Sequence, residues 1–213
     1  MASDVSIAVY KLGGSLLSMP GLAPRLRALI ASAANTRPLL LTGGGPAADL
    51  VRDWDRLHDL SSVAAHELAM RSLRLNDALV CTLLPECRHV ASREAVEACW
   101  NRGRLPVLDA LSFLDSEPSL QGDLLAQDWT VTSDSIAAWV TIHWPADRLI
   151  LLKSRDVPTG LSWNDAAGSH LVDACFPTLV DQVKSIGWVN LRSERPLEID
   201  CRSAASPGGI PET

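Results

Sequence analysis

The sequence has 213 residues, 47% of them hydrophobic, and its 25 acidic and 19 basic side chains give a net charge of -6. Such a chain can bury a substantial core, and an acidic chain without a Lys/Arg run argues against nucleic acid as a partner. The N-terminus lacks a signal-peptide pattern, and no apolar run approaches the ~18 residues of a membrane span. We therefore expect a cytoplasmic protein without a membrane partner.

The cysteines and histidines show no spacing typical of a metal site or a disulfide framework. The cysteines are odd in number and contain no C-x-x-C pair, so we predict buried, reduced thiols. The histidines lack metal-ligand spacing, and we predict no protein-bound metal. The cysteines are Cys81, Cys87, Cys99, Cys175 and Cys201.

The first half of the chain alternates strand-like and helix-like segments. Residues 5–10 form a β-type run that ends at a glycine pair, and apolar residues at helical spacing continue to Ala34. Pro38 ends this helical region, residues 39–41 resemble a short buried strand, and a second glycine cluster opens another helix. Further on we predict a helix from Ser61 or Ser62 through 84, a strand at 87–90, a helix at 92–101 and a strand at 105–108.

The second half begins after an irregular connection at 112–129. A helix is predicted from Thr132 through 141, then a buried strand at 148–152 that ends at Lys153. A last helix centred on 178–185, a strand at 188–191 and a frayed tail at 203–213 follow.

This alternation predicts an α/β fold, a three-layer αβα sandwich with a mainly parallel central sheet. We expect a single domain over 1–202, with an N-terminal lobe at about 1–114 and a C-terminal lobe at about 128–202. In such sheets, ligands bind at the carboxyl ends of the strands.

The first glycine turn is a candidate anion site. Gly13 and Gly14 would let backbone N–H groups approach a phosphate at a helix start, and Lys11 could neutralise its charge. The spacing fits neither a Walker A loop nor a G-x-G-x-x-G fingerprint. A tight β–α turn without a ligand is the alternative.

The second cluster, Gly43-Gly44-Gly45, strengthens the case because three consecutive glycines cost backbone entropy. Two such turns could hold two phosphate-bearing ligands face to face. The chain has only three lysines, and Lys11 and Lys153 end predicted strands, whereas Lys184 fits better as a surface residue.

Asp134 and the tryptophans each allow two interpretations. Asp134 could cap a helix, or its carboxylate could lie between two lysines and hold both ammonium groups. Trp129 and Trp139 flank this segment and could pack in the core or stack on a ring-bearing substrate.

Three segments in this order resemble the amino acid kinase family: residues 9–16 (VYKLGGSL), 40–45 (LLTGGG) and 133–138 (SDSIAA). The resemblance covers roughly 5–192 and implies ATP, with Mg²⁺ carried by the nucleotide, and at least a dimer. It implies catalytic roles for Lys11 and Asp134 and phosphate contacts at Gly13, Gly14 and Ser15. It places the acceptor at Gly43, Gly44, Gly45 and Ser133.

Within the family, residues 128–138 and the short length look most like the branch linked to methanofuran and tetrahydromethanopterin, whose kinase acts on an aminomethyl-furan-methyl phosphate. Residues 151–157 (LLKSRDV) depart from the family's L-T-D-V-D-G nucleotide loop, and no G-G-M-x-x-K segment follows. We assign the missing cation to Lys153 and nucleotide contacts to Ser154 and Asp156.

The function predicted from the sequence is therefore transfer of the γ-phosphoryl group of ATP to a small anionic acceptor. Two alternatives stay open: a carboxylate acceptor that would give an acyl phosphate, and a non-catalytic member that keeps the fold and an anion site.

Overall fold

The computed structural model describes residues 5–33, 35–116, 125–160 and 162–201. The predicted tail and part of the predicted irregular connection lie outside these ranges. Within them, no helix is long and apolar enough to cross a membrane.

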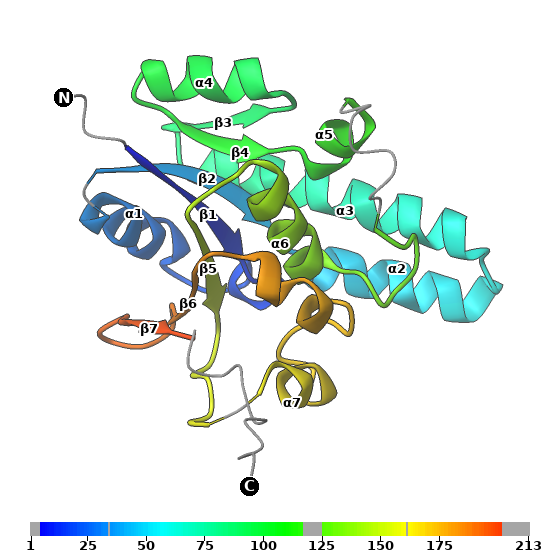
Figure 1. Cartoon of the computed structure of the whole chain (residues 1–213). Coiled ribbons are helices and arrows are strands. Elements are labelled where there is room, and N and C mark those ends of the chain that lie inside the picture. Colours follow the sequence, from blue (N-terminus) through cyan, green and yellow to red (C-terminus); the bar gives the residue numbers. More distant parts are fainter. Residues whose placement is uncertain (1–4, 34, 117–124, 161, 202–213) are drawn as a thin grey trace, which may run out of the picture.

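A seven-stranded sheet forms the centre of the molecule (Figure 1). Its strand order is β3-β4-β2-β1-β5-β6-β7, and all neighbours pair in parallel except β6 and β7. The predicted α/β class with a mainly parallel sheet is confirmed. The strands are β1 (Ser6–Leu12), β2 (Thr36–Thr42), β3 (Cys87–Val90), β4 (Leu105–Leu108), β5 (Arg148–Lys153), β6 (Ile186–Asn190) and β7 (Glu198–Asp200).

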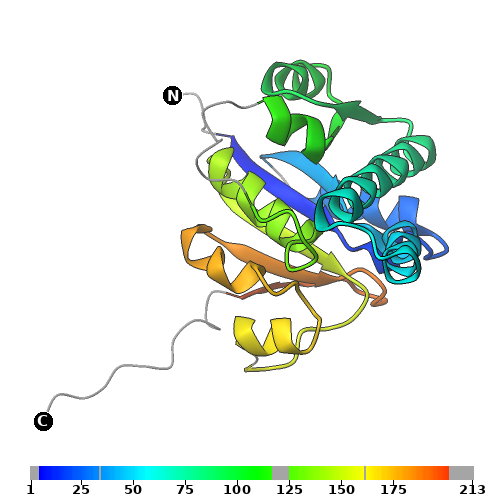
Figure 2. The same cartoon turned by 90° about the vertical axis from the view of Figure 1, so that its right-hand side faces the viewer.

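Helices cover both faces of this sheet because its central strands bury side chains in both directions. In β1, Val9 belongs to a core that includes Trp139, whereas Tyr10 belongs to a second core that includes Leu26. Helices α2 and α3 lie alongside each other in both views (Figures 1 and 2). The α-helices are α1 (Leu22–Ser32), α2 (Gly45–His58), α3 (Ser62–Leu83), α4 (Arg93–Asn101), α5 (Ala110–Ser116), α6 (Ser133–His143) and α7 (Trp163–Gly168).

The register of the three central strands brings the candidate residues to one edge. Leu12, the last residue of β1, pairs with Thr42 on one side and with Leu152 on the other. Both glycine turns therefore start at the same level, and Lys153 follows one residue beyond Leu152. Parallel pairing thus places three segments that are far apart in sequence at one edge.

The prediction of a last helix centred on 178–185 is wrong. The chain there forms two 3-10 turns, Phe176–Thr178 and Val180–Gln182, and β6 then begins two residues earlier than the predicted strand at 188–191. The hydroxyl of Thr178 donates to the Cys175 carbonyl, which offers the backbone a local alternative to an α-helix.

Three smaller expectations are also corrected. Pro38 lies inside β2 instead of before it, where its carbonyl accepts a hydrogen bond from Trp100 Nε1. Helix α5 occupies the start of the predicted irregular connection, and α7 and β7 were not predicted. All five cysteines are free, but Cys81 and Cys175 are only half-buried.

Candidate active site

One buried carboxylate joins two lysines, Lys11 near the end of β1 and Lys153 at the end of β5. Lys11 Nζ lies 2.9 Å from Asp134 Oδ1, and Lys153 Nζ lies 2.8 Å from Oδ1 and 2.9 Å from Oδ2. Lys11 is 3% exposed and Asp134 is 6% exposed. The carboxylate is therefore bound between two ammonium groups away from bulk water, and it does not serve as an ordinary surface cap.

Burial and neighbouring charges shift the pKa values of Asp134 and Lys153. Burial alone would raise the pKa of Asp134, but the ammonium groups of Lys11 and Lys153 outweigh it and hold the pKa below its usual value. Burial lowers the pKa of Lys153 to about 8, although Asp134 acts in the opposite direction. Lys153 is thus a cation that can lose its charge near neutral pH.

Lys153 has two further contacts that fix its side chain. Its Nζ donates to the Leu171 carbonyl at 2.6 Å and lies 5.4 Å from the centre of the Trp188 ring. Trp188 is itself held by a hydrogen bond from Nε1 to the Arg155 carbonyl. These contacts within the protein therefore define the position of the ammonium group.

The two glycine turns pack directly against each other. A Cβ on Gly14 would lie 2.1 Å from the backbone nitrogen of Gly45, and one on Gly43 would lie 2.7 Å from that of Gly14. Gly45 also has φ +49, which favours glycine. The glycines thus allow two backbones to meet beside the lysines, a reason that the sequence alone did not reveal.

Helix α3 anchors the second turn. Asn76 is buried, and its Nδ2 donates to the carbonyls of Gly43 and Gly44 at 2.7 and 2.8 Å. Next to it, Asp77 accepts a hydrogen bond from Thr42 at 2.7 Å. With these carbonyls occupied, the orientation of the peptide groups in the turn is fixed.

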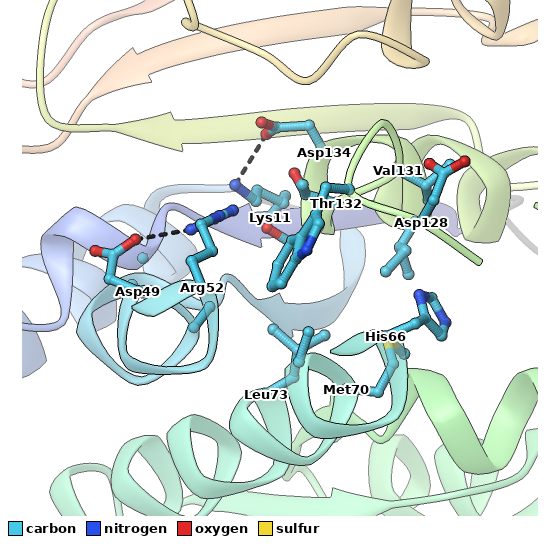
Figure 3. A pocket seen from close by; sticks show the side chains of 18 of the residues that line it. Lys11, Asp49, Arg52, His66, Met70, Leu73, Asp128, Val131, Thr132 and Asp134 are labelled. Atoms are coloured by element: carbon cyan, nitrogen blue, oxygen red, sulfur yellow. Dashed lines mark hydrogen bonds and ion pairs between the residues drawn. The ribbon is translucent and has the colours of Figure 1, made fainter. Parts of the chain in front are cut away.

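A cavity of about 270 Å³ opens beside Lys11, between α2, α3 and the start of α6 (Figure 3). In the view of Figure 3, Lys11 and Arg52 point to one end of it, while His66 and Met70 line the other. Its lining includes seven of the residues predicted from sequence: Lys11, Gly14, Ser15, Gly44, Gly45, Ser133 and Asp134.

Arg52, which the sequence analysis missed, is held in the wall of this cavity. Its guanidinium donates to Asp49 at 2.7 Å and lies 4.7 Å from the centre of the Trp129 ring. Trp129 Nε1 in turn donates to Asp55 at 2.6 Å. The result is a pre-organised cation on an aromatic face, a combination suited to a flat anionic ligand. Trp139, by contrast, is buried in the core.

Two predicted residues that follow β5, Ser154 and Asp156, lie outside the lining of that cavity, and Ser15 contacts Ser154 from the lining. Ser15 Oγ donates to Ser154 Oγ at 2.9 Å, and Asp156 accepts from Asn190 at 3.0 Å. Arg192 donates from Nη2 to the Ser15 carbonyl at 3.1 Å. Hydroxyl and guanidinium donors thus cluster on the other side of the first glycine turn. Gly13 and Gly43 also lie outside the cavity lining.

The structure therefore brings seven predicted site residues into the cavity lining, joins Lys153 to them through Asp134, and places Ser154 beside Ser15. Sequence reasoning missed Arg52, His66 and Asn76, whereas it had named Trp129 as a residue that could stack on a ring-bearing substrate. The one available signal was the helical spacing of Asp49, Arg52 and Asp55 directly after a glycine turn. Among the described residues, no group of three His, Cys, Asp or Glu side chains could hold a metal ion.

A mainly parallel sheet with glycine turns at adjoining strand ends and two lysines on one carboxylate suits the transfer of a phosphoryl group. Residues 6–158 match the model of the amino acid kinase family, and the chain belongs to that family. It is accordingly a phosphotransferase that acts on a small molecule.

Three proteins illustrate the similarity. The chain is 26% identical over 194 residues to [5-(aminomethyl)furan-3-yl]methyl phosphate kinase of Methanocaldococcus jannaschii, covering 85% of this chain and 86% of that one. Among solved structures, uridylate kinase from Archaeoglobus fulgidus superposes with a TM-score of 0.59, at 18% identity over 85% and 88% of the two chains. UMP kinase from Ureaplasma parvum gives 0.62, at 13% identity over 90% and 92%. The two structural likenesses support the fold.

Proposed function

We propose that this protein transfers the γ-phosphoryl group of ATP to the phosphate of a small ring-bearing acceptor, [5-(aminomethyl)furan-3-yl]methyl phosphate or a close analogue. The observation that carries the proposal is the buried Lys11–Asp134–Lys153 arrangement beside a small cavity with its own cation. The acceptor's name comes from the kinase of Methanocaldococcus jannaschii. A role in building a furan-based one-carbon cofactor would follow from that acceptor.

In the proposed reaction, an oxygen of the acceptor phosphate attacks the γ-phosphorus while the bond to the β-phosphate oxygen breaks and ADP leaves. Charge spreads over the transferring group, so positioning and neutralisation supply most of the catalysis. Lys11 and Lys153 would neutralise this charge, and Asp134 would keep both ammonium groups directed at it. Backbone N–H groups of the glycine turns, at Gly13, Gly14 and Gly43 to Gly45, would contribute further donors.

The nucleotide is assigned to the side of the first glycine turn where Ser15, Ser154 and Asp156 lie. Hydroxyl groups and the nearby Arg192 are suitable partners for phosphate oxygens. Mg²⁺ would arrive bound to the nucleotide and neutralise its phosphates.

The acceptor is assigned to the cavity, where Gly44, Gly45 and Ser133 line the wall next to Lys11. Arg52 would bind the acceptor's phosphate, and Trp129 would face its ring. An acceptor that already carries a phosphate brings more negative charge than a carboxylate, and the pair of cations Lys11 and Arg52 at one end favours it.

The decisive experiment measures ADP release and the diphosphate product by ³¹P NMR with the furan phosphate, UMP and aspartate as acceptors. Arg52→Ala should raise the KM for the phosphate acceptor by roughly 10- to 100-fold, the value of a charge-assisted hydrogen bond, and leave the KM for ATP unchanged. Arg56→Ala is the matched control, because Arg56 lies on the same helix and is paired with Asp53 outside the cavity.

Two results would contradict this proposal. Hydroxamate formed on trapping with hydroxylamine would identify an acyl phosphate and hence a carboxylate acceptor. Calorimetry that detects no binding of ATP, with or without Mg²⁺, would support a non-catalytic member of the family.

We further propose that the protein self-associates, at least as a dimer. Support comes from apolar side chains that α3 exposes at helical spacing, Leu75, Leu79 and Leu83. Light scattering coupled to gel filtration tests this, and a monomer at high concentration would contradict it.

A further inference from the structure

Helix α6 begins without a cap from its own sequence. Its N-cap residue, Thr132, makes no side-chain capping hydrogen bond, and the carboxylate of Asp134 is engaged by the two lysines. The first N–H groups of a helix lack intrahelical acceptors and need partners from elsewhere. The start of the helix that bears Asp134 therefore depends on another part of the chain.

Asp173, about forty residues away, supplies those acceptors. Its Oδ2 accepts from the backbone nitrogens of Thr132 and Ser135, both at 3.0 Å, and from the Thr132 hydroxyl at 2.8 Å. Its Oδ1 accepts from the Ser135 hydroxyl and from the Phe176 nitrogen at 3.0 Å. The Asp173 carboxylate thus accepts from five donors, of which four belong to Thr132 and Ser135 at the start of α6 and one is the Phe176 nitrogen. The dipole of α6 also favours a negative charge at this end of the helix.

The segment that contains Asp173 also binds Lys153, the partner of Asp134. Two residues before Asp173, the Leu171 carbonyl accepts the hydrogen bond from Lys153 Nζ. Residues 171–173 therefore contact the helix that carries the carboxylate and also the ammonium group bound to it. A displacement of this segment would change both partners together.

We propose that Asp173 is a positioning residue that sets the start of α6 and so holds the Asp134 carboxylate between Lys11 and Lys153. The effect of Asp173 on turnover rests on the proposed phosphoryl transfer, whereas its effect on the position of Asp134 does not. Five groups face the Lys153 ammonium, and they are Asp134 from α6, Lys11 from β1, the Trp188 ring from β6, and both Asp173 and the Leu171 carbonyl from one segment.

The charge of Asp173 also acts on Lys153, which gives the proposal a direct readout. Burial lowers the pKa of Lys153, and Asp173 acts against it, as Asp134 does. Removing the carboxylate of Asp173 should therefore lower the pKa of Lys153 further below about 8. A movement of Asp134 away from Lys153 would also lower the pKa of Lys153.

The experiment is an NMR titration of protein with ¹³C at lysine Cε, which gives three signals because the chain has three lysines. Asp173→Asn keeps one acceptor oxygen without the charge, and Asp173→Ala removes all acceptors. Ser92→Ala is the matched control, because Ser92 caps α4 by accepting from the Ala95 nitrogen far from the lysines in the fold.

We expect the pKa of Lys153 to fall in the order wild type, Asp173→Asn, Asp173→Ala, with turnover reduced by up to about 100-fold in the last variant. Ser92→Ala should lose stability without either effect. An unchanged Lys153 titration in a folded Asp173→Asn protein would overturn the proposal, as would equal effects in Ser92→Ala. Since the titration needs no substrate, it decides this point even if the wild-type protein proves inactive as a kinase.

Discussion

Lys153 is a buried lysine whose pKa departs clearly from its ordinary value. A buried ammonium group is costly, and it remains charged here because Asp134 and the Leu171 carbonyl bind it. Its pKa of about 8 leaves it close to losing that charge under mild conditions. An anionic ligand would restore the charge, so the free protein is the state in which the shift is visible.

This shift predicts opposite effects of pH on activity and on stability. Activity, measured as kcat/KM for ATP, should fall as pH rises through about 8, because Lys153 would lose the charge proposed to neutralise the phosphoryl group. The contribution of Lys153 to the free energy of unfolding should instead increase as the pH rises from about 8 to 10.5, the ordinary pKa of lysine. In this pH range the unfolded state binds the proton more tightly than the folded state does.

A pH–rate profile and urea titrations at each pH measure the two trends. Lys184→Met is the control, because that lysine pairs with Asp147 on the surface and should leave the alkaline limb in place. A profile that stays flat roughly one pH unit above the Lys153 pKa would show that the charge is not required.

Lys11 is the second buried cation expected to contribute to turnover. Lys11→Ala should fold, because Asp134 keeps Lys153 as its partner, but should lose roughly 100- to 1000-fold in kcat, as expected for one group that stabilises transition-state charge. A coupled ADP assay measures turnover and circular dichroism verifies the fold. Lys184→Ala serves as the control, and wild-type turnover in Lys11→Ala would remove Lys11 from the mechanism.

Lys11 and Lys153 could be predicted from the sequence because lysine is rare in this chain. Two of only three lysines end strands, and parallel strand ends meet at one edge, so pattern alone brought Lys11 and Lys153 together. Asp173 and Asn76 gave no such signal. Their partners are backbone groups about forty and thirty residues away, and only folding reveals those contacts.

The glycine turns need glycine because their backbones pack against each other, and not only because a ligand could approach them. Any side chain at Gly14 would enter the backbone of Gly45, and the contact keeps η1 (Gly14–Leu16) against the start of α2. The close packing of the turns and the binding of a phosphate are compatible, since both need bare backbone.

Gly14→Ala is therefore predicted to destabilise the protein by about 2–3 kcal/mol, the range for overpacking against a backbone that must shift. Gly168→Ala is the matched control, because a Cβ there meets nothing within 4 Å and should be neutral or stabilise by up to about 0.5 kcal/mol. Chemical denaturation compares the two. Equal stability of both variants would mean that the turns do not pack as described.

Element prediction succeeded where periodicity and caps agreed. Helix α3 begins at the serine pair and ends before Pro85, as predicted, because Ser61 accepts from the Ala64 nitrogen. It failed at 178–185, where apolar residues at near-helical spacing pack as 3-10 turns under α6 instead. Short apolar runs do not distinguish these outcomes, because the packing partner decides between them.

For the whole molecule, the arrangement of the sheet bears on the two expected lobes. Strand β1 from the N-terminal lobe pairs with β2 on one side and with β5 of the C-terminal lobe on the other. Hydrophobic residues of β1, β2 and β5 also share both cores. Neither lobe can therefore lose its structure without exposing apolar surface of the other.

The sheet predicts that the described part of the chain unfolds in a single cooperative step, despite the two lobes expected from the sequence. Calorimetry should give a ratio of van't Hoff to calorimetric enthalpy of about 1, and tryptophan fluorescence and far-UV circular dichroism should give coincident midpoints. The tryptophans suit this test because Trp54 and Trp100 report on the first half and Trp163 and Trp188 on the second. Two resolved transitions, or fluorescence that changes before the circular dichroism, would mean that the lobes are independent and that β1 separates from β5. In that event the alignment of Lys11 with Lys153 would depend on how the lobes dock, and the single sheet could no longer be the reason why the two lysines meet at one carboxylate.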